Sequence, residues 1–191
     1  MIMKTILLSI SLFFLSSNSF ISNPYHTGKN NSDKLSALHI ELNPVGEVYM
    51  IIDKSDYELH VYDENGWFAT YPVVFGNKNL DDKKMEGDRN TPEGEFHINA
   101  KRMHTKWHKF ISIDYPNEGS WQKFKERKNR GEIPSSARIG GGIGIHGTWP
   151  HEDYQIDRYN NWTLGCISLK NEDIDHLYAY LKIGTQLIIR K

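Results

Sequence analysis

The feature that most constrains the fold is the alternation of apolar and polar residues along residues 47–76, EVYMIIDKSDYELHVYDENGWFATYPVVFG. Val48–Ile52 is an apolar run that predicts a first strand. Tyr57, Leu59 and Val61 then alternate with polar residues, as they do in a strand that is buried on one face. The DENG tetrapeptide that follows is a turn signal ahead of a third run, WFATYPVVF. The segment therefore predicts consecutive strands joined by turns.

Two more strands are predicted after a long polar loop at residues 77–94, and loops of this length are often functional. The segment EFHINAKRM places Phe96 and Ile98 on one face of a strand, and TQLIIRK predicts a last strand. Strands and helices do not alternate along the chain, so the pattern does not indicate a parallel sheet. We expect a mainly β fold of the β-rich α+β type, antiparallel, with two or three short helices.

The segment SWQKFKERKNRG predicts the first helix. Ser120 is the expected N-cap, Trp121 and Phe124 are expected to face the core, and Gly131 is expected to end the helix. Its basic run, KFKERKNR, is interpreted as a solvated face, with binding of an anionic polymer as the alternative.

The segment NEDIDHLYAYLKIG predicts the second helix. Asn171 is the expected cap, because its side chain can accept a hydrogen bond from a free amide of the first turn. Ile174, Leu177 and Leu181 form one apolar stripe, and Gly184 is the expected stop.

The N-terminus has the pattern of a secretory signal peptide at residues 1–22. One lysine in MIMK precedes the uncharged run TILLSISLFFLSS, and small residues lie at Ser17 and Ser19. An uncleaved membrane anchor and a buried helix are the alternatives, although the run is short for a span of about 20 residues. A polar lead-in at residues 23–46 follows. The chain is thus expected to be exported, to the periplasm or cell envelope.

Cys166 is the only cysteine of the 191 residues, and it follows a glycine in NNWTLGCISL. In an exported chain, a single cysteine is either a free thiol or part of an intermolecular bridge. A buried, unreactive cysteine is the other interpretation. The net charge of −1 does not indicate a nucleic-acid partner.

A nucleophilic cysteine reacts as its thiolate, so at neutral pH it needs a base nearby. His146 lies twenty residues upstream, directly before Gly147 in IHG, and is the candidate base. The amides beside Gly165 and Cys166 are candidates for an oxyanion hole, because glycine lets the backbone come close to a substrate.

Metal and phosphate sites were weighed against this interpretation. His146, His151, Asp153 and Cys166 are close in sequence, but zinc sites usually have tighter paired spacing. The histidines of HTKWH, residues 104–108, have the spacing of a zinc helix without the glutamate of HExxH. ARIGGGIGIHG lacks the lysine and Ser/Thr of a phosphate loop. We therefore predict neither a metal site nor a cofactor.

Four stretches together resemble the L,D-transpeptidase family, with its YkuD-type catalytic domain, over residues 47–191. They are YMIIDKSDYELHVYDENG, EGDRNTPEGEFHI, GIGIHGTW and WTLGCISL, in the family's order and spacing. The segment DYPNEGSWQKF, followed by a helix and by glycines, is most similar to the YafK-like branch. The resemblance implies a YkuD-like antiparallel β-sandwich.

The resemblance also implies roles for residues. Cys166 would be the nucleophile, His146 the base, and the carbonyl of Gly147 would orient the imidazole. The Gly165 and Cys166 amides would form the oxyanion hole. The substrate would be a peptidoglycan stem peptide, whose diaminopimelate carbonyl Cys166 attacks to expel a D-amino acid. An amine would resolve the thioester, giving a 3-3 cross-link or a protein attachment.

Thr163, Ser168 and Trp149 are candidates for lining the substrate site. The sequence departs from the family pattern at Leu164, where the motif usually has histidine, and at Ser168, where arginine or asparagine is more frequent. The first departure could alter the lining on the acceptor side, and the second puts substrate anchoring in question.

Two alternatives to transpeptidation remain open. In the first, water resolves the thioester, and the same site is a peptidoglycan amidase or hydrolase. In the second, the chain is a non-enzymatic cell-wall binding protein. A depressed pKa of Cys166 would favour an enzyme, and an ordinary or raised pKa would favour the binding protein.

Overall fold

The computed structural model describes residues 43–191. The predicted signal peptide and most of the polar lead-in therefore lie outside the described residues. The strands are β1 Tyr49–Asp53, β2 Glu58–Asp63, β3 Gly66–Pro72, β4 Gly94–His104, β5 His108–Ile113, β6 Gly144–His146, β7 Ile167–Ser168 and β8 Gln186–Arg190. The helices are α2 Glu118–Asn129, α3 Tyr154–Asp157 and α4 Asn171–Tyr180. Among the residues that the structure describes, no helix has the length and apolar character needed to cross a membrane.

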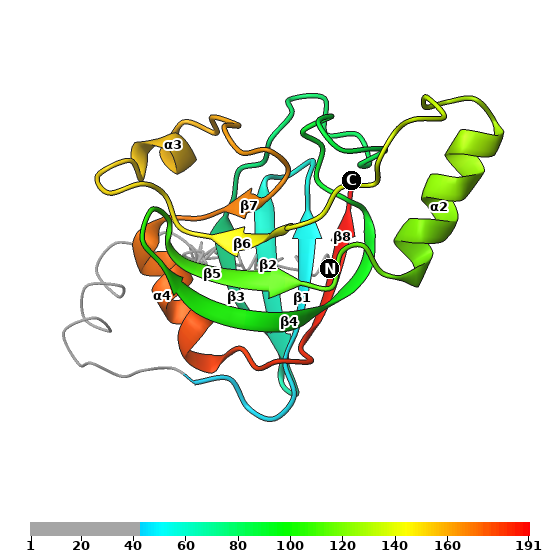
Figure 1. The fold of residues 1–191 in the computed structure, drawn as a ribbon. Coiled ribbons are helices and arrows are strands. Elements are labelled where there is room, and N and C mark those ends of the chain that lie inside the picture. The colour runs from blue at the N-terminus through cyan, green and yellow to red at the C-terminus, as the bar shows by residue number, and fades with distance from the viewer. Residues whose placement is uncertain (1–42) are drawn as a thin grey trace, which may run out of the picture. The chain divides into compact units, whose positions relative to one another are not determined.

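The eight strands form one mixed sheet in the order β3-β2-β1-β8-β4-β5-β6-β7 (Figure 1). The prediction of a β-rich fold with few helices is confirmed. Most neighbouring strands are antiparallel, as expected, but β1 pairs with β8 and β6 pairs with β7 in parallel. Both parallel pairs join segments that are far apart in sequence, and neighbouring strands of this kind leave no local pattern.

Strand β4 connects the two halves of the sheet. Its first residues, Gly94–His97, pair with β8, and its later residues, from Ile98 onward, pair with β5. A register shift after Ile98 accompanies the change of partner, and β4 curves across the molecule (Figure 1). Buried side chains from both halves, such as Ile52 and Ile145, belong to one core. This curvature brings the short strands β6 and β7 over that core.

The alternation read from the sequence corresponds to the burial of the strands. Leu59, Val61, Phe96 and Ile98 are all buried, and their polar neighbours are more exposed. Burying each such side chain contributes about 1.5–3 kcal/mol to folding. The regular alternation explains why strand positions could be predicted from sequence.

Helix α2 differs from its prediction at its first turn. Asn117, rather than Ser120, is the N-cap, and its side chain accepts hydrogen bonds from the Ser120 amide and hydroxyl. Asn117 has the extended backbone that an N-cap needs, whereas Ser120 already lies in the helix. Phe124 is buried as expected, but Trp121 is 43% exposed and packs against the edge of the Phe124 ring. The helix lies at the periphery of the sheet, so only one narrow face is covered (Figure 1).

Helix α4 has the predicted stripe, and its Ile174 and Leu177 are buried. Asn171 is the first residue of the helix, and Lys170 is the N-cap, which corrects the prediction. The Asn171 side chain is turned away from its own helix and accepts a hydrogen bond from the Thr148 amide at 3.1 Å. It therefore supports the segment that follows β6.

Candidate active site

The pairing of β6 with β7 brings Cys166 and His146 together. Ile145 lies opposite Ile167, and His146 lies opposite Ser168. Continuing this register by one residue places Cys166 beside Gly144, diagonally from His146. Residues two apart on a strand project to the same face, so the thiol and the imidazole share one face of the pair.

The Cys166 thiol is half-buried and has no disulfide partner. Its Sγ lies 3.5 Å from the carbonyl oxygen of Gly142, to which the thiol can donate a hydrogen bond. Burial raises the pKa of Cys166 above its ordinary value, and the Gly144 amide and the charge of Lys83 oppose this shift only in part. The thiol is therefore protonated at neutral pH.

His146 is buried, and its tautomer is defined by one contact. Its Nδ1 lies 2.7 Å from the carbonyl oxygen of Gly147, which can only accept a hydrogen bond. Nδ1 must therefore carry the proton, and Nε2 is left as an acceptor. This is the nitrogen that a base needs to take a proton from a thiol.

Aromatic rings hold the His146 imidazole in place. Trp107 stacks on it with ring centroids 4.7 Å apart, and Phe110 stacks at 5.8 Å. The Trp162 ring packs against the imidazole in a T-shaped arrangement, with the ring centroids 5.5 Å apart. Trp107, in the turn between β4 and β5, also stacks on His104, the last residue of β4. These apolar faces exclude water from His146 and restrict its rotation.

Burial lowers the pKa of His146 to about 4, and the nearby His104 acts in the same direction, while the Gly147 carbonyl opposes it. At neutral pH the site thus contains a neutral thiol and a neutral imidazole, not a thiolate with an imidazolium. The raised pKa of Cys166 is the direction that we expected of a binding protein. That criterion assumed a preformed thiolate. By that criterion alone the direction favours the binding protein. An enzyme with this pKa would have to transfer the thiol proton to a base during attack.

The depressed pKa of His146 predicts a loss of stability in mild acid. In the unfolded chain, histidine binds a proton below about pH 6.5, whereas folded His146 does so only near pH 4. The free energy of unfolding should therefore fall between these pH values, by about 3 kcal/mol in total. Urea unfolding at several pH values would measure this, and His146→Gln should flatten the curve. Parallel curves for the variant and the wild type would contradict the prediction.

Gly147 and Ser168 lie behind His146. The Ser168 hydroxyl is 3.4 Å from the Gly147 carbonyl oxygen that also accepts from His146. Ser168 is fully buried, which corrects the prediction that it lines the substrate site. Gly147 has no room for a side chain, because a Cβ there would overlap the Asn171 amide. The Gly147 carbonyl thus orients the imidazole directly, and Ser168 does so indirectly through its hydrogen bond to that carbonyl.

The turn that carries Cys166 is closed by Thr163. The Thr163 hydroxyl donates to the Cys166 carbonyl at 2.8 Å and accepts from the Gly165 amide at 3.1 Å. The Gly165 amide is therefore already engaged, and its predicted place in an oxyanion hole needs correction. Thr163 is itself buried, so it braces the turn and does not line the surface. Among the described residues, the hydrogen bonds include none from the Cys166 amide, which is free to bind an oxyanion.

The long loop at residues 77–94 holds this turn. The Arg89 guanidinium donates two hydrogen bonds to the Thr163 carbonyl, and the Thr91 hydroxyl donates to the Gly165 carbonyl at 3.0 Å. Gly165 has a φ of +125°, and a Cβ there would lie 2.8 Å from the Asn90 carbonyl oxygen. Glycine is therefore required both by its backbone conformation and by the close approach of the loop.

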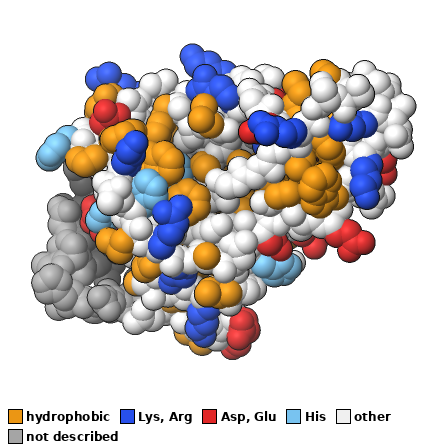
Figure 2. Space-filling view, viewed as in Figure 1, with side chains coloured by type: hydrophobic (Ala, Val, Ile, Leu, Met, Phe, Trp, Pro, Cys, Tyr) orange, Lys and Arg blue, Asp and Glu red, His pale blue; other side chains and the backbone are white. Residues whose placement is uncertain are grey.

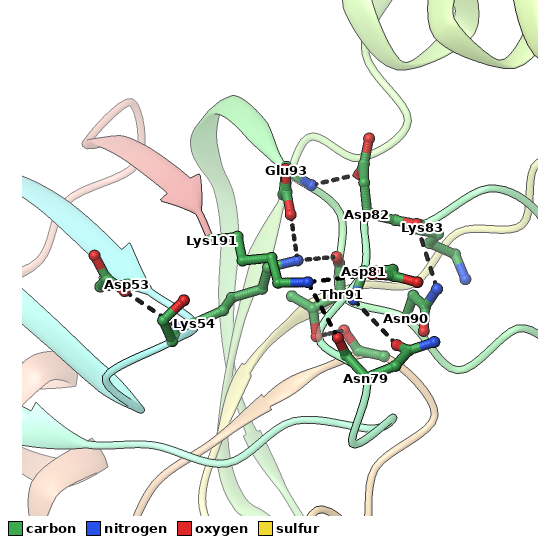
Figure 3. A network of polar contacts seen from close by, with 12 residues as sticks. Asp53, Lys54, Asn79, Asp81, Asp82, Lys83, Asn90, Thr91, Glu93 and Lys191 are labelled. Carbon is green, nitrogen blue, oxygen red and sulfur yellow. Dashed lines mark hydrogen bonds and ion pairs between the residues drawn. The ribbon is translucent and has the colours of Figure 1, made fainter.

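Buried charges anchor the same loop (Figure 3). Lys54, which follows β1, is fully buried and pairs with Glu93 at 2.7 Å. Asp82 accepts from the Glu93 amide and from Arg127 of α2. Arg127 belongs to the basic run that we interpreted as a solvated face, so part of that face instead fixes the loop. Lys83 pairs with Asp88, whose carboxylate also binds three loop amides.

Hydrophobic and basic side chains are interspersed on the face of the molecule shown in Figure 2. Leu164, which replaces the usual motif histidine, is 76% exposed next to the nucleophile turn. Trp149 is 38% exposed, and Lys106 lies 5.5 Å above its ring. Both positions are compatible with contact to a substrate, and the role predicted for Trp149 stays a prediction.

Three of the candidate metal-binding histidines, His104, His108 and His146, have other partners. His104 Nδ1 accepts from two amides of its turn, and His108 lies 2.8 Å from Asp175. Asp153 accepts from the Thr148 hydroxyl at 2.5 Å. Within residues 43–191, no cluster of three or more His, Cys, Asp or Glu side chains could hold a metal ion.

The sequence predicts Cys166 and His146 as the catalytic residues, and that role stays a prediction. It gave no role to Arg89, Thr91, Trp107 or Trp162. The first two belong to EGDRNTPEGEFHI, so the motif was visible while its contacts were not. Trp107 lies within HTKWH, which was considered only for its histidines.

The chain is similar to L,D-transpeptidase catalytic domains in sequence. The sequence model of the YkuD family, described as the L,D-transpeptidase catalytic domain, matches residues 47–189. The protein "Putative L,D-transpeptidase YqjB" of Bacillus subtilis (strain 168) is 28% identical over 152 residues, which are 77% of this chain and 74% of YqjB.

Solved structures share the fold. The helical cell shape determining protein Pgp2 from Campylobacter jejuni is 24% identical with a TM-score of 0.56, covering 76% of this chain and 48% of that chain. An L,D-transpeptidase from Mycobacterium smegmatis is 14% identical with a TM-score of 0.51, covering 76% of this chain and 59% of that chain. The chain thus spans about half the length of Pgp2. Membership of the YafK-like branch of the family stays a prediction.

Proposed function

Because the chain belongs to the YkuD family of L,D-transpeptidase catalytic domains, we propose that it is a cysteine-dependent L,D-transpeptidase acting on peptidoglycan stem peptides. The observation that carries the proposal is the β6–β7 register, which places the only cysteine on the same face as His146, a buried, neutral imidazole whose Nδ1 donates to the Gly147 carbonyl. A binding protein would need neither the thiol nor this tautomer.

The proposed reaction has two halves. In the first, His146 Nε2 takes the thiol proton while Cys166 Sγ attacks the carbonyl carbon of an L-centred residue, typically diaminopimelate. The carbonyl oxygen becomes an oxyanion that the Cys166 amide can bind. The intermediate collapses to a thioester, and the leaving D-amino acid takes its amine proton from His146.

In the second half, an amine acceptor attacks the thioester carbonyl and gives up a proton to His146. The C–S bond then breaks, and the departing Cys166 thiolate takes that proton back from His146. The product is a 3-3 cross-link, or an attachment if the amine belongs to a protein. Leu164 and Trp149 are exposed, and the Lys106 ammonium lies over the Trp149 ring, which supports a substrate that carries free carboxylates. The proposal implies a periplasmic or cell-envelope location, with the segment at residues 1–22 as the export signal or anchor.

Mass spectrometry of defined muropeptides incubated with the protein tests this proposal, with Cys166→Ala alongside. We expect a new dimer joined through two diaminopimelate residues, formed only by the wild type. A product that has only gained water would replace transpeptidation by hydrolysis. Unchanged muropeptides with a folded wild-type protein would contradict both.

A further inference from the structure

The orientation of the Cys166 amide depends on its neighbour across the peptide bond. In a trans peptide, the carbonyl of one residue and the N–H of the next point in opposite directions. The carbonyl of Gly165 and the amide of Cys166 form such a pair. Whatever holds the Gly165 carbonyl therefore sets the direction of the Cys166 N–H.

The Gly165 carbonyl is held by Thr91. The Thr91 hydroxyl donates to it at 3.0 Å, and Thr91 is buried. The contact joins two segments that are distant in sequence, the loop at residues 77–94 and the nucleophile turn. The loop itself is fixed by the buried Lys54–Glu93 pair, since Lys54 Nζ lies 3.5 Å from the Thr91 carbonyl and 2.7 Å from Glu93 (Figure 3).

Rotation of this peptide is restricted on both sides. The Gly165 amide donates to the Thr163 hydroxyl, and the Cys166 carbonyl accepts from the same hydroxyl. The two peptide groups that flank the Gly165–Cys166 bond are thus fixed within the turn. Thr91 provides the only side-chain contact to the Gly165 carbonyl among the described residues. Without it, the Cys166 N–H would lose its preorganised direction, which is the property that makes an oxyanion hole effective.

We infer that Thr91 is a positioning residue, which orients the Cys166 amide toward the oxyanion by holding the Gly165 carbonyl. The inference rests on the proposed function, because it assumes that a carbonyl is attacked at Cys166. The sequence predicted an oxyanion hole made of the Gly165 and Cys166 amides. In the inferred arrangement only the Cys166 amide donates to the oxyanion, and the Thr91 hydroxyl fixes the Gly165–Cys166 peptide through the Gly165 carbonyl.

The test compares two reactions of the same thiol. In acylation by p-nitrophenyl acetate, Sγ attacks the ester carbonyl and an oxyanion forms. p-Nitrophenolate then departs, and the acetyl group remains on Sγ as a thioester. In alkylation by iodoacetamide, Sγ displaces iodide at a saturated carbon, and no oxyanion forms. Because Cys166 is the only cysteine, thiol adducts identify this site, and both reactions are measured as the adduct on Cys166 by peptide mass spectrometry.

Thr91→Val removes the hydroxyl and nearly keeps the shape. We expect it to slow acylation by at least about tenfold, a smaller loss than removal of a donor itself, and to change alkylation by less than about twofold. Thr91→Ser keeps the hydroxyl and should restore acylation. Thr70→Val is the matched control, because its hydroxyl bonds His60 in the strand pair β2–β3. If Thr91→Val does not fold, Thr91→Ala serves the same comparison.

An equal loss of both reactions, or no loss of either, would overturn the inference, since the hydroxyl would then act on the thiol or on nothing. A wild-type protein that the ester does not acylate at Cys166 would overturn it as well. Selective loss of acylation, with no turnover of muropeptides by the wild type, would support the role of Thr91 and contradict only the proposed substrate.

Discussion

Replacing Cys166 by alanine is expected to abolish muropeptide turnover, by at least about a thousandfold, while leaving the protein folded. The half-buried thiol contacts only backbone groups, the Gly142 carbonyl and the Gly144 amide, through weak hydrogen bonds, so its loss should cost the fold little. Hydrogen bonds from Thr163, Arg89 and Thr91 to backbone carbonyls hold the turn around it, and none of these side chains is hydrogen-bonded to Sγ. Mass spectrometry of the intact protein would show the thioester with the wild type and no adduct with the variant.

Cys166→Ser is the sharper comparison. The hydroxyl has nearly the shape of the thiol, but its pKa is far higher, and a neutral imidazole with a depressed pKa is a weak base for it. We expect a folded protein with little or no turnover. If Cys166→Ala retained a tenth of the wild-type rate, the thioester mechanism would be wrong. Circular dichroism and urea unfolding would separate that result from misfolding.

The strands could be predicted, and Cys166 and His146 could be selected as catalytic candidates, because these signals are local. Leu59, Val61, Phe96 and Ile98 follow the period of two that a half-buried strand imposes, and all four are buried. Cys166 and His146 were recognisable because each lies beside glycine, in a short motif whose chemistry requires that residue type.

What could not be predicted depends on contacts between distant segments. Thr91 and Gly165 meet only because the long loop folds under the nucleophile turn, and no spacing within either segment encodes this. The predicted role of the Gly165 amide was wrong for a related reason. A glycine before the nucleophile indicates a close backbone approach, but not which amide is already bonded within the turn.

Helix α2 shows the same limit for surface residues. Trp121 and Phe124 are three residues apart, so both could have faced the core. Only Phe124 is buried, because the helix lies at the edge of the sheet and covers it along one narrow face. The position of a helix relative to the sheet is decided by tertiary contacts, such as that of Arg127 with Asp82.

Replacing His146 by alanine is expected to have the second large effect, a fall of about 100- to 10,000-fold in the acylation rate at neutral pH. Burial raises the pKa of Cys166, so the variant would depend on a small fraction of spontaneous thiolate. That fraction rises tenfold per pH unit below the pKa of the thiol. The wild-type rate should instead stay nearly constant from neutral pH down toward pH 5, because His146 remains a free base until about pH 4.

The pH dependence of the acylation rate, compared between the wild type and His146→Ala, tests whether His146 takes the thiol proton. Acylation by p-nitrophenyl acetate between pH 5 and pH 10 should show the rates converging in alkali, where the thiol ionises without help. His60→Ala is the matched control, because His60 bonds Thr70 in another part of the sheet and should leave the profile unchanged. A His146→Ala profile parallel to that of the wild type would mean that the imidazole holds the site together without taking the proton. Convergence would mean that the fold keeps both partners neutral and forms the thiolate only as the substrate is attacked.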